Sequence, residues 1–235
     1  SDVYKRQIHA HQRLQGPAAG GWRYSGRGRD ADLSVTQFAA LALHAAHTVW
    51  DIPTPPQVKT ALEGYLATAT GKKGGFSYQP GRGETVSMTG AGMIALACAG
   101  VSSSDPRAER ARDFIGADWA RENVGDGYAM YTVMKAAKLG THEVTRFGGH
   151  DWRQEYVLHL ARTQREDGAW KDDGRWGQGT LATVWPALTL SKDVVCSAAP
   201  LQSRSIAWQV VGGAAAGVVV LAWLTRPLLR RRPGR

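Results

Sequence analysis

Residues 164–170 read QREDGAW, and this stretch decides which fold the sequence predicts. Related stretches come earlier, GGWRY at residues 20–24 and GGFSY at residues 74–78. Each places a large aromatic residue after glycine and before an alanine- and leucine-rich segment. Glycine permits the positive φ of a tight turn, and the ring can bury a large apolar area. The recurrence predicts structural joints between repeated units, formed by Gly21, Trp22, Gly75, Phe76, Gln164, Gly168 and Trp170.

The segments between these joints have the periodicity of helices. Three segments are apolar on one side only, and they start with helix-initiating residues at 54–56, at 104–106 and near Asp151. Four others are apolar on almost every side, which is typical of buried helices. They are residues 34–46, 87–99, 127–140 and 180–190, the third being the most polar. We therefore expect an all-α chain in which amphipathic and buried helices alternate.

The spacing of the joints indicates a helical-hairpin repeat. Trp22 and Phe76 are 54 residues apart, and Phe76 and Trp170 are 94 apart, with Gly127 and Tyr128 at the expected intermediate position. A period of about 47 residues containing two helices is typical of repeat architectures. Two arrangements fit such a repeat: an open solenoid, or a closed ring with the buried helices inside.

The motif resembles a known repeat. QREDGAW is similar to the Gln-x-x-x-Gly-x-Trp repeat of the squalene cyclase and protein prenyltransferase superfamily. Residues 20–43, GGWRYSGRGRDADLSVTQFAALAL, resemble the repeat of bacterial prenyltransferase/squalene-oxidase-repeat proteins. The likeness covers residues 8–190 and implies an α/α toroid, in which the motif joins an outer helix to an inner one.

By this resemblance, residues 8–192 form a partial toroid with about four of the six inner helices. At least two further hairpins are then expected upstream of this fragment. Residues 1–7, SDVYKRQ, are expected to be a non-native prefix.

The catalytic residues that the resemblance would imply have no counterpart in the sequence. Cyclases of that superfamily use an acidic Asp-x-Asp-Asp element, and the prenyltransferases hold zinc through aspartate, cysteine and histidine. Asp30 and Asp32 precede a predicted helix, where carboxylates cap free amides, and Asp172 lies in a glycine-rich loop. No acid or cysteine partner is evident for His44 and His47, so we expect no metal and no cofactor.

Seven residues are candidates for a ligand-binding cavity. Tyr128, Tyr131 and Lys135 recur at i, i+3 and i+7 on one helix face. The other four are Gln37, His44, His47 and Trp185. An aromatic cavity would suit an isoprenoid, or could stabilise a cation through its ring faces. Alternatively, these side chains fill the centre of the fold, with their hydroxyls bonded to neighbours.

The C-terminal segment predicts a membrane anchor. An apolar stretch begins at Ile206 and ends at Leu224, with Gln209 as its one polar side chain. Nineteen residues rising about 1.5 Å each can just cross a hydrocarbon core of roughly 30 Å. We expect a linker at residues 193–204, a transmembrane helix at 205–226 and a basic tail at 227–235. The arginines after the span place that tail in the cytoplasm and the repeat domain outside it.

The charge distribution argues against a nucleic-acid partner. The chain has a net charge of +9, but residues 205–235 contribute five arginines and no acid, which leaves +4 for the other 204 residues. The sequence thus predicts a membrane-anchored, externally facing domain that binds an apolar ligand or an envelope protein without cyclase activity. The alternative is a fragment of a terpene cyclase or prenyltransferase-type enzyme whose catalytic residues lie upstream.

Overall fold

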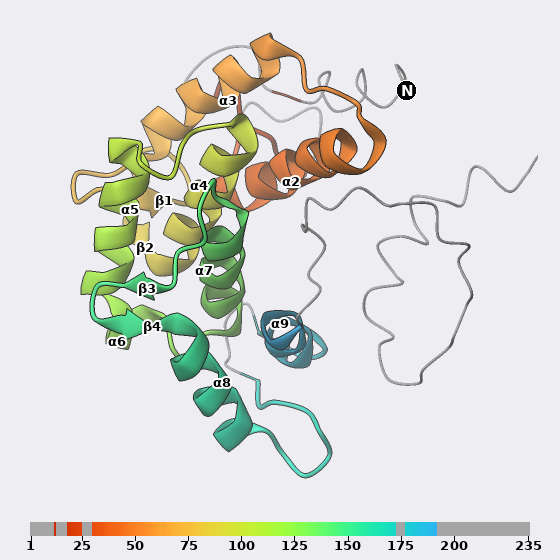
Figure 1. The fold of residues 1–235 in the computed structure, drawn as a ribbon, viewed down its shortest axis with the longest axis vertical. Helices are drawn as coiled ribbons and strands as arrows, with labels where there is room; N and C mark the ends of the chain where they lie inside the picture. The colour runs from red at the N-terminus through yellow and green to blue at the C-terminus, as the bar shows by residue number, and fades with distance from the viewer. Residues whose placement is uncertain (1–11, 13–17, 25–29, 173–176, 192–235) are drawn as a thin grey trace, which may run out of the picture. The chain divides into compact units, whose positions relative to one another are not determined.

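The computed structural model of the chain describes residues 12, 18–24, 30–172 and 177–191. These residues are mostly helical, which confirms the all-α prediction at that level (Figure 1). The helices are α2 (Leu33–Trp50), α3 (Pro56–Ala69), α4 (Val86–Ala99), α5 (Pro106–Ala117), α6 (Trp119–Glu122), α7 (Gly127–Leu139), α8 (Trp152–Thr163) and α9 (Leu181–Leu190). Two short antiparallel pairs accompany them: β1 (Phe76–Ser77) with β2 (Glu84–Thr85), and β3 (Arg146–Phe147) with β4 (His150–Asp151).

Short polar side chains determine where these helices begin. Asp32 accepts a hydrogen bond from the backbone of Val35 and so caps α2, as the sequence predicts. Asp105 caps α5 in the same way and is followed by a proline in the first turn. Asp151 caps α8. Two of the one-sided segments, α5 and α8, therefore start at capping residues where the sequence predicts. The third, α3, also starts at the predicted place, but its N-cap is Pro55 and no side chain caps it.

The nearly all-round apolar segments form a row of helices. α4 packs against α2 on one side and α7 on the other, and α7 packs against α9. α3 and α5 both pack on α4, and Figure 1 shows them on one side of that row. Small residues permit the close approach, since a Cβ on Gly90 would lie 2.6 Å from Thr132 Oγ1. Such a row is expected of an open solenoid and of a ring alike.

The three aromatic residues of the joints make the same backbone contact. In each case the backbone N–H donates a hydrogen bond to a threonine hydroxyl near the start of the next helix of the row. The N···O distances are 3.0 Å for Trp22 and Thr36, 3.0 Å for Phe76 and Thr89, and 3.3 Å for Trp170 and Thr183. The joints are thus one repeated structure, and Trp22 and Phe76 are buried within it.

The joint glycines also share a conformation. Gly20, Gly74 and Gly168 each lie two residues before the aromatic residue, with φ of +90°, +91° and +81°. The first two also lie against a neighbouring helix: a Cβ on Gly20 would lie 1.7 Å from the carbonyl oxygen of Ala61 in α3, and one on Gly74 would lie 2.7 Å from Arg110 Cβ in α5. Around Gly168, no described residue comes within 4 Å of that position. The positive φ therefore favours glycine at all three joints, and the close contact with a neighbouring helix leaves no room for a side chain at two of them.

Two side chains of the QREDGAW stretch, Gln164 and Trp170, each donate a hydrogen bond to a backbone carbonyl oxygen. Gln164 Nε2 donates to the carbonyl oxygen of Gly168 at 2.9 Å and so closes the turn. The indole Nε1 of Trp170 donates to the carbonyl oxygen of Leu160 at 3.0 Å, near the end of α8. The same carbonyl also accepts the backbone N–H of Gln164 at 3.0 Å, so the tryptophan adds a second hydrogen bond to the helix end and the glutamine side chain stabilises the loop.

The intermediate joint differs from the other three. Tyr128 lies inside the first turn of α7, whereas Trp22 and Trp170 lie in loops and Phe76 begins the two-residue strand β1. The short helix α6 stands before α7 where the others have a glycine-aromatic loop, and its Trp119 is buried. The spacing rule therefore located the helix correctly but not the joint that precedes it.

The predicted membrane anchor cannot be compared with the fold. The apolar stretch that begins at Ile206, with its linker and basic tail, lies outside the described residues. Within those residues, no helix combines the length and the apolar character that crossing a membrane requires.

Candidate ligand cavity

A cavity of about 640 Å³ lies at the N-terminal ends of the helices in the row. Its volume is within the range of about 300–1,000 Å³ that is usual for small-molecule sites. The apolar and aromatic residues that line it are Tyr24, Val35, Phe38, Tyr78, Val86, Met88, Tyr128, Leu181 and Trp185. The polar lining consists of Ser34, Thr85, Ser87, Glu122 and Asp126.

Two of the joints supply part of this lining. Tyr24 and Tyr78 each follow the joint aromatic residue by two positions, and both line the cavity. Arg23 holds the two joints together, because it is ion-paired with Asp32 and donates a hydrogen bond to the Tyr78 hydroxyl at 2.7 Å. Burial alone would lower the pKa of Arg23, but these hydrogen bonds outweigh it and raise the pKa above its ordinary value. Asp30 lies 3.3 Å from Arg23 Nε, so two carboxylates balance the positive charge of the guanidinium.

Four of the seven candidate residues come together. Gln37 Nε2 donates a hydrogen bond to the Tyr128 hydroxyl, and the Trp185 ring lies 5.2 Å from that of Tyr128 and 5.0 Å from that of Tyr131. Tyr128 and Trp185 line the cavity, and Gln37 is fully buried behind them. Burial raises the pKa of Tyr128, so its hydroxyl stays neutral. Tyr128 and Tyr131 are both buried in the core, and Tyr128 also lines the cavity.

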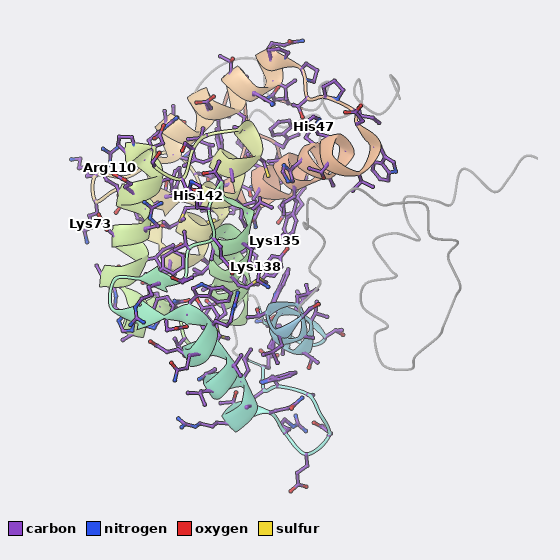
Figure 2. All side chains as sticks on the ribbon, in the orientation of Figure 1. His47, Lys73, Arg110, Lys135, Lys138 and His142 are labelled. Carbon is purple, nitrogen blue, oxygen red and sulfur yellow. The ribbon has the colours of Figure 1, made fainter. Side chains whose placement is uncertain are left out.

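The other three candidate residues lie elsewhere. His44 and His47 belong to the C-terminal half of α2, and His47 is exposed near the turn into α3 (Figure 2). Lys135 is buried on α7, two turns after Tyr128. Burial, followed by the charges of His47 and Lys135, lowers the pKa of His44. None of the three lines the cavity.

Sequence reasoning missed two carboxylates and two tyrosines of the lining. A signal for Tyr24 and Tyr78 was present, because both stretches that define the repeat end in tyrosine. Nothing in the periodicity pointed to Glu122, which ends the four-residue helix α6. Asp126 caps α7 by accepting from the backbone of Ala129 at 2.9 Å. A helix as short as α6 has no apolar stripe to reveal it.

In the described part of the chain, no three side chains of histidine, cysteine, aspartate or glutamate gather as a metal site would need. The cavity instead offers ring faces, aliphatic groups and two carboxylates. Such a lining suits the binding of a largely apolar molecule.

The sequence matches no protein-family model, and no curated protein is similar to it. The likeness to the squalene cyclase and prenyltransferase repeat therefore depends on the residues of the joints themselves.

Proposed function

We propose that this chain binds an apolar ligand in the cavity at the N-terminal ends of α2, α4, α7 and α9. The observation behind the proposal is the lining, in which nine of fourteen residues are apolar or aromatic. Phe38 is 44% exposed and Leu181 is 43% exposed, although both lie on helices of the row. A ligand that covers them gains about 25 cal/mol for each Å² of apolar surface removed from water.

The proposal extends to the architecture and the location. We propose a squalene cyclase/prenyltransferase-like repeat domain that is anchored by the segment from Ile206 to Leu224 and faces outward. The repeated joints support the first part, and the apolar segment with its arginines supports the second. Fractionation of cells and protease treatment of intact membranes test the anchor. A chain washed from membranes by carbonate, or a repeat domain protected on the cytoplasmic side, contradicts it.

Mass spectrometry of apolar molecules that co-purify with the full chain tests the ligand. Val35 lines the cavity from the first turn of α2, so Val35→Trp places a large ring in the binding space. We expect the wild-type chain to carry an apolar molecule and this variant to lose most of it. Val157→Trp is the matched control, because Val157 is 48% exposed on α8 and is not part of the lining.

Circular dichroism shows whether each variant keeps the helical fold. Equal amounts of ligand on a folded Val35→Trp variant and on the wild type would contradict the proposed site. A wild-type preparation free of any apolar molecule, and unable to bind one that is added, would contradict the function itself.

A further inference from the structure

The charge of the cavity is opposite to that of the chain. The chain carries +9, yet the charged residues in the described lining are Glu122 and Asp126. The nearby Arg23, which donates to Tyr78, is already paired with two other carboxylates. A ligand head group therefore meets an acidic environment in this cavity.

Glu122 has an unused acceptor. Its Oε1 lies 3.6 Å from Arg121 Nη2, and that guanidinium is closer to Asp118, at 2.9 Å. Its Oε2 is buried and accepts no hydrogen bond from any residue that the structure describes. A buried carboxylate oxygen without a donor is costly, and a turn of the Glu122 carboxylate toward a ligand N–H group in the cavity would remove this cost.

The remaining features of the lining also favour a cation. The rings of Tyr128 and Trp185 line the cavity, and the faces of such rings attract ammonium groups. The rings of Tyr24 and Tyr78 already have the Arg23 guanidinium over them, at 5.6 and 5.8 Å from the ring centroids. Free amides at helix N-termini would instead attract an anion. Here Thr85 caps α4 by accepting a hydrogen bond from the backbone of Met88 at 3.2 Å, and Asp126 caps α7. Amides at the N-termini of both helices are therefore already engaged.

We infer that the ligand is an amphiphile with a primary ammonium head group. Its alkyl part packs on Phe38 and Leu181, and its head donates a hydrogen bond to Glu122. This inference rests on the proposed function and specifies the chemical class of the ligand.

Photoreactive probes with one octyl chain and different heads provide the test. The heads are a primary ammonium, a hydroxyl and a phosphate monoester, each presented to the full chain in the same neutral detergent. Mass spectrometry locates the labelled peptides, and the concentration for half-maximal labelling of the cavity peptides is compared. We expect the ammonium probe to label at concentrations about tenfold lower than the hydroxyl probe, as is typical of a hydrogen bond to a charged group.

Variants connect this preference to Glu122. Glu122→Gln should bring the ammonium probe to within about twofold of the hydroxyl probe, because the charge is lost while the shape is kept. Glu109→Gln is the matched control, since that glutamate lies on the exposed side of α5 and outside the lining. Asp126→Asn is a second test that preserves a helix-capping side chain.

The outcomes separate the two proposals. Cavity labelling by the hydroxyl probe without any preference for ammonium overturns this inference and leaves the apolar site standing. Tighter labelling by the phosphate probe, or a preference that persists in both folded variants, also overturns it. Absence of cavity labelling by all three probes overturns the proposed function as well.

Discussion

At the scale of single residues, one hydroxyl group makes each joint. Thr89 Oγ1 accepts the backbone N–H of Phe76 at 3.0 Å and donates to the carbonyl oxygen of Thr85 at 2.7 Å. The contact joins the loop after one helix to the first turn of the next. Because Phe76 and Thr89 are both fully buried, no water can replace that hydroxyl.

We expect Thr89→Val to destabilise the chain by about 1–3 kcal/mol, since it keeps the shape and leaves a buried N–H without an acceptor. Urea unfolding followed by circular dichroism measures the free energy of unfolding. Thr163→Val is the control, because its hydroxyl also bonds to a carbonyl one turn back in a helix, but is exposed. Equal losses in the two variants would show that the joint contact contributes nothing.

At the scale of helices, a hydrogen bond connects two members of the row that are not neighbours. Gln37 belongs to α2 and Tyr128 to α7, and α4 packs between these helices. The two side chains therefore meet over α4, beside the cavity. This contact joins α2 to α7 across α4 and fixes the orientation of the Tyr128 ring, which lines the cavity.

A double-mutant cycle measures this contact. Tyr128→Phe leaves the Gln37 amide buried without its partner and should cost about 1–3 kcal/mol. Gln37→Leu keeps the volume and lets the tyrosine hydroxyl turn to the cavity. We expect the double variant to be more stable than the sum of the single effects by about 1 kcal/mol, measured by urea unfolding. Additive effects would show that the two side chains do not interact.

At the scale of the whole molecule, two partly buried histidines make stability depend on pH. Burial, with the charges of His47, Lys135 and Lys59, lowers the pKa of His44, and burial lowers the pKa of His159. The unfolded chain therefore binds these protons at a higher pH than the folded chain does. Their contribution to stability is present above about pH 6.5, the ordinary pKa of histidine, and is lost as the pH falls through the folded-state pKa.

We expect the free energy of unfolding to decrease between pH 7 and pH 5, and to decrease less in His44→Gln than in the wild type. Urea titrations at a series of pH values measure this slope. His142→Gln serves as the reference, because that side chain is exposed in a loop. A His44→Gln variant with the wild-type slope would exclude His44 as a source of the pH dependence.

Features that depend on neighbouring residues in the sequence could be predicted, and features that depend on distant residues could not. The proline after Asp105 and the cap at Asp32 indicate helix starts directly, so those helices begin where expected. The pair of Gln37 and Tyr128 is different, because the two residues are 91 positions apart and periodicity places each on a buried face without naming its partner. Glu122 was beyond prediction, since its position depends on how α6 packs.

The open surroundings of Gly168 affect which substitutions and insertions the chain can tolerate. Alanine at Gly20 or Gly74 would collide with the neighbouring helix. Alanine at Gly168 would meet no described residue within 4 Å, so its cost would come from the positive φ alone. The three joints therefore differ in how much sequence change they allow. Of the three joints, the turn at residues 165–168 is the one where an inserted reporter peptide would disturb a neighbouring helix least.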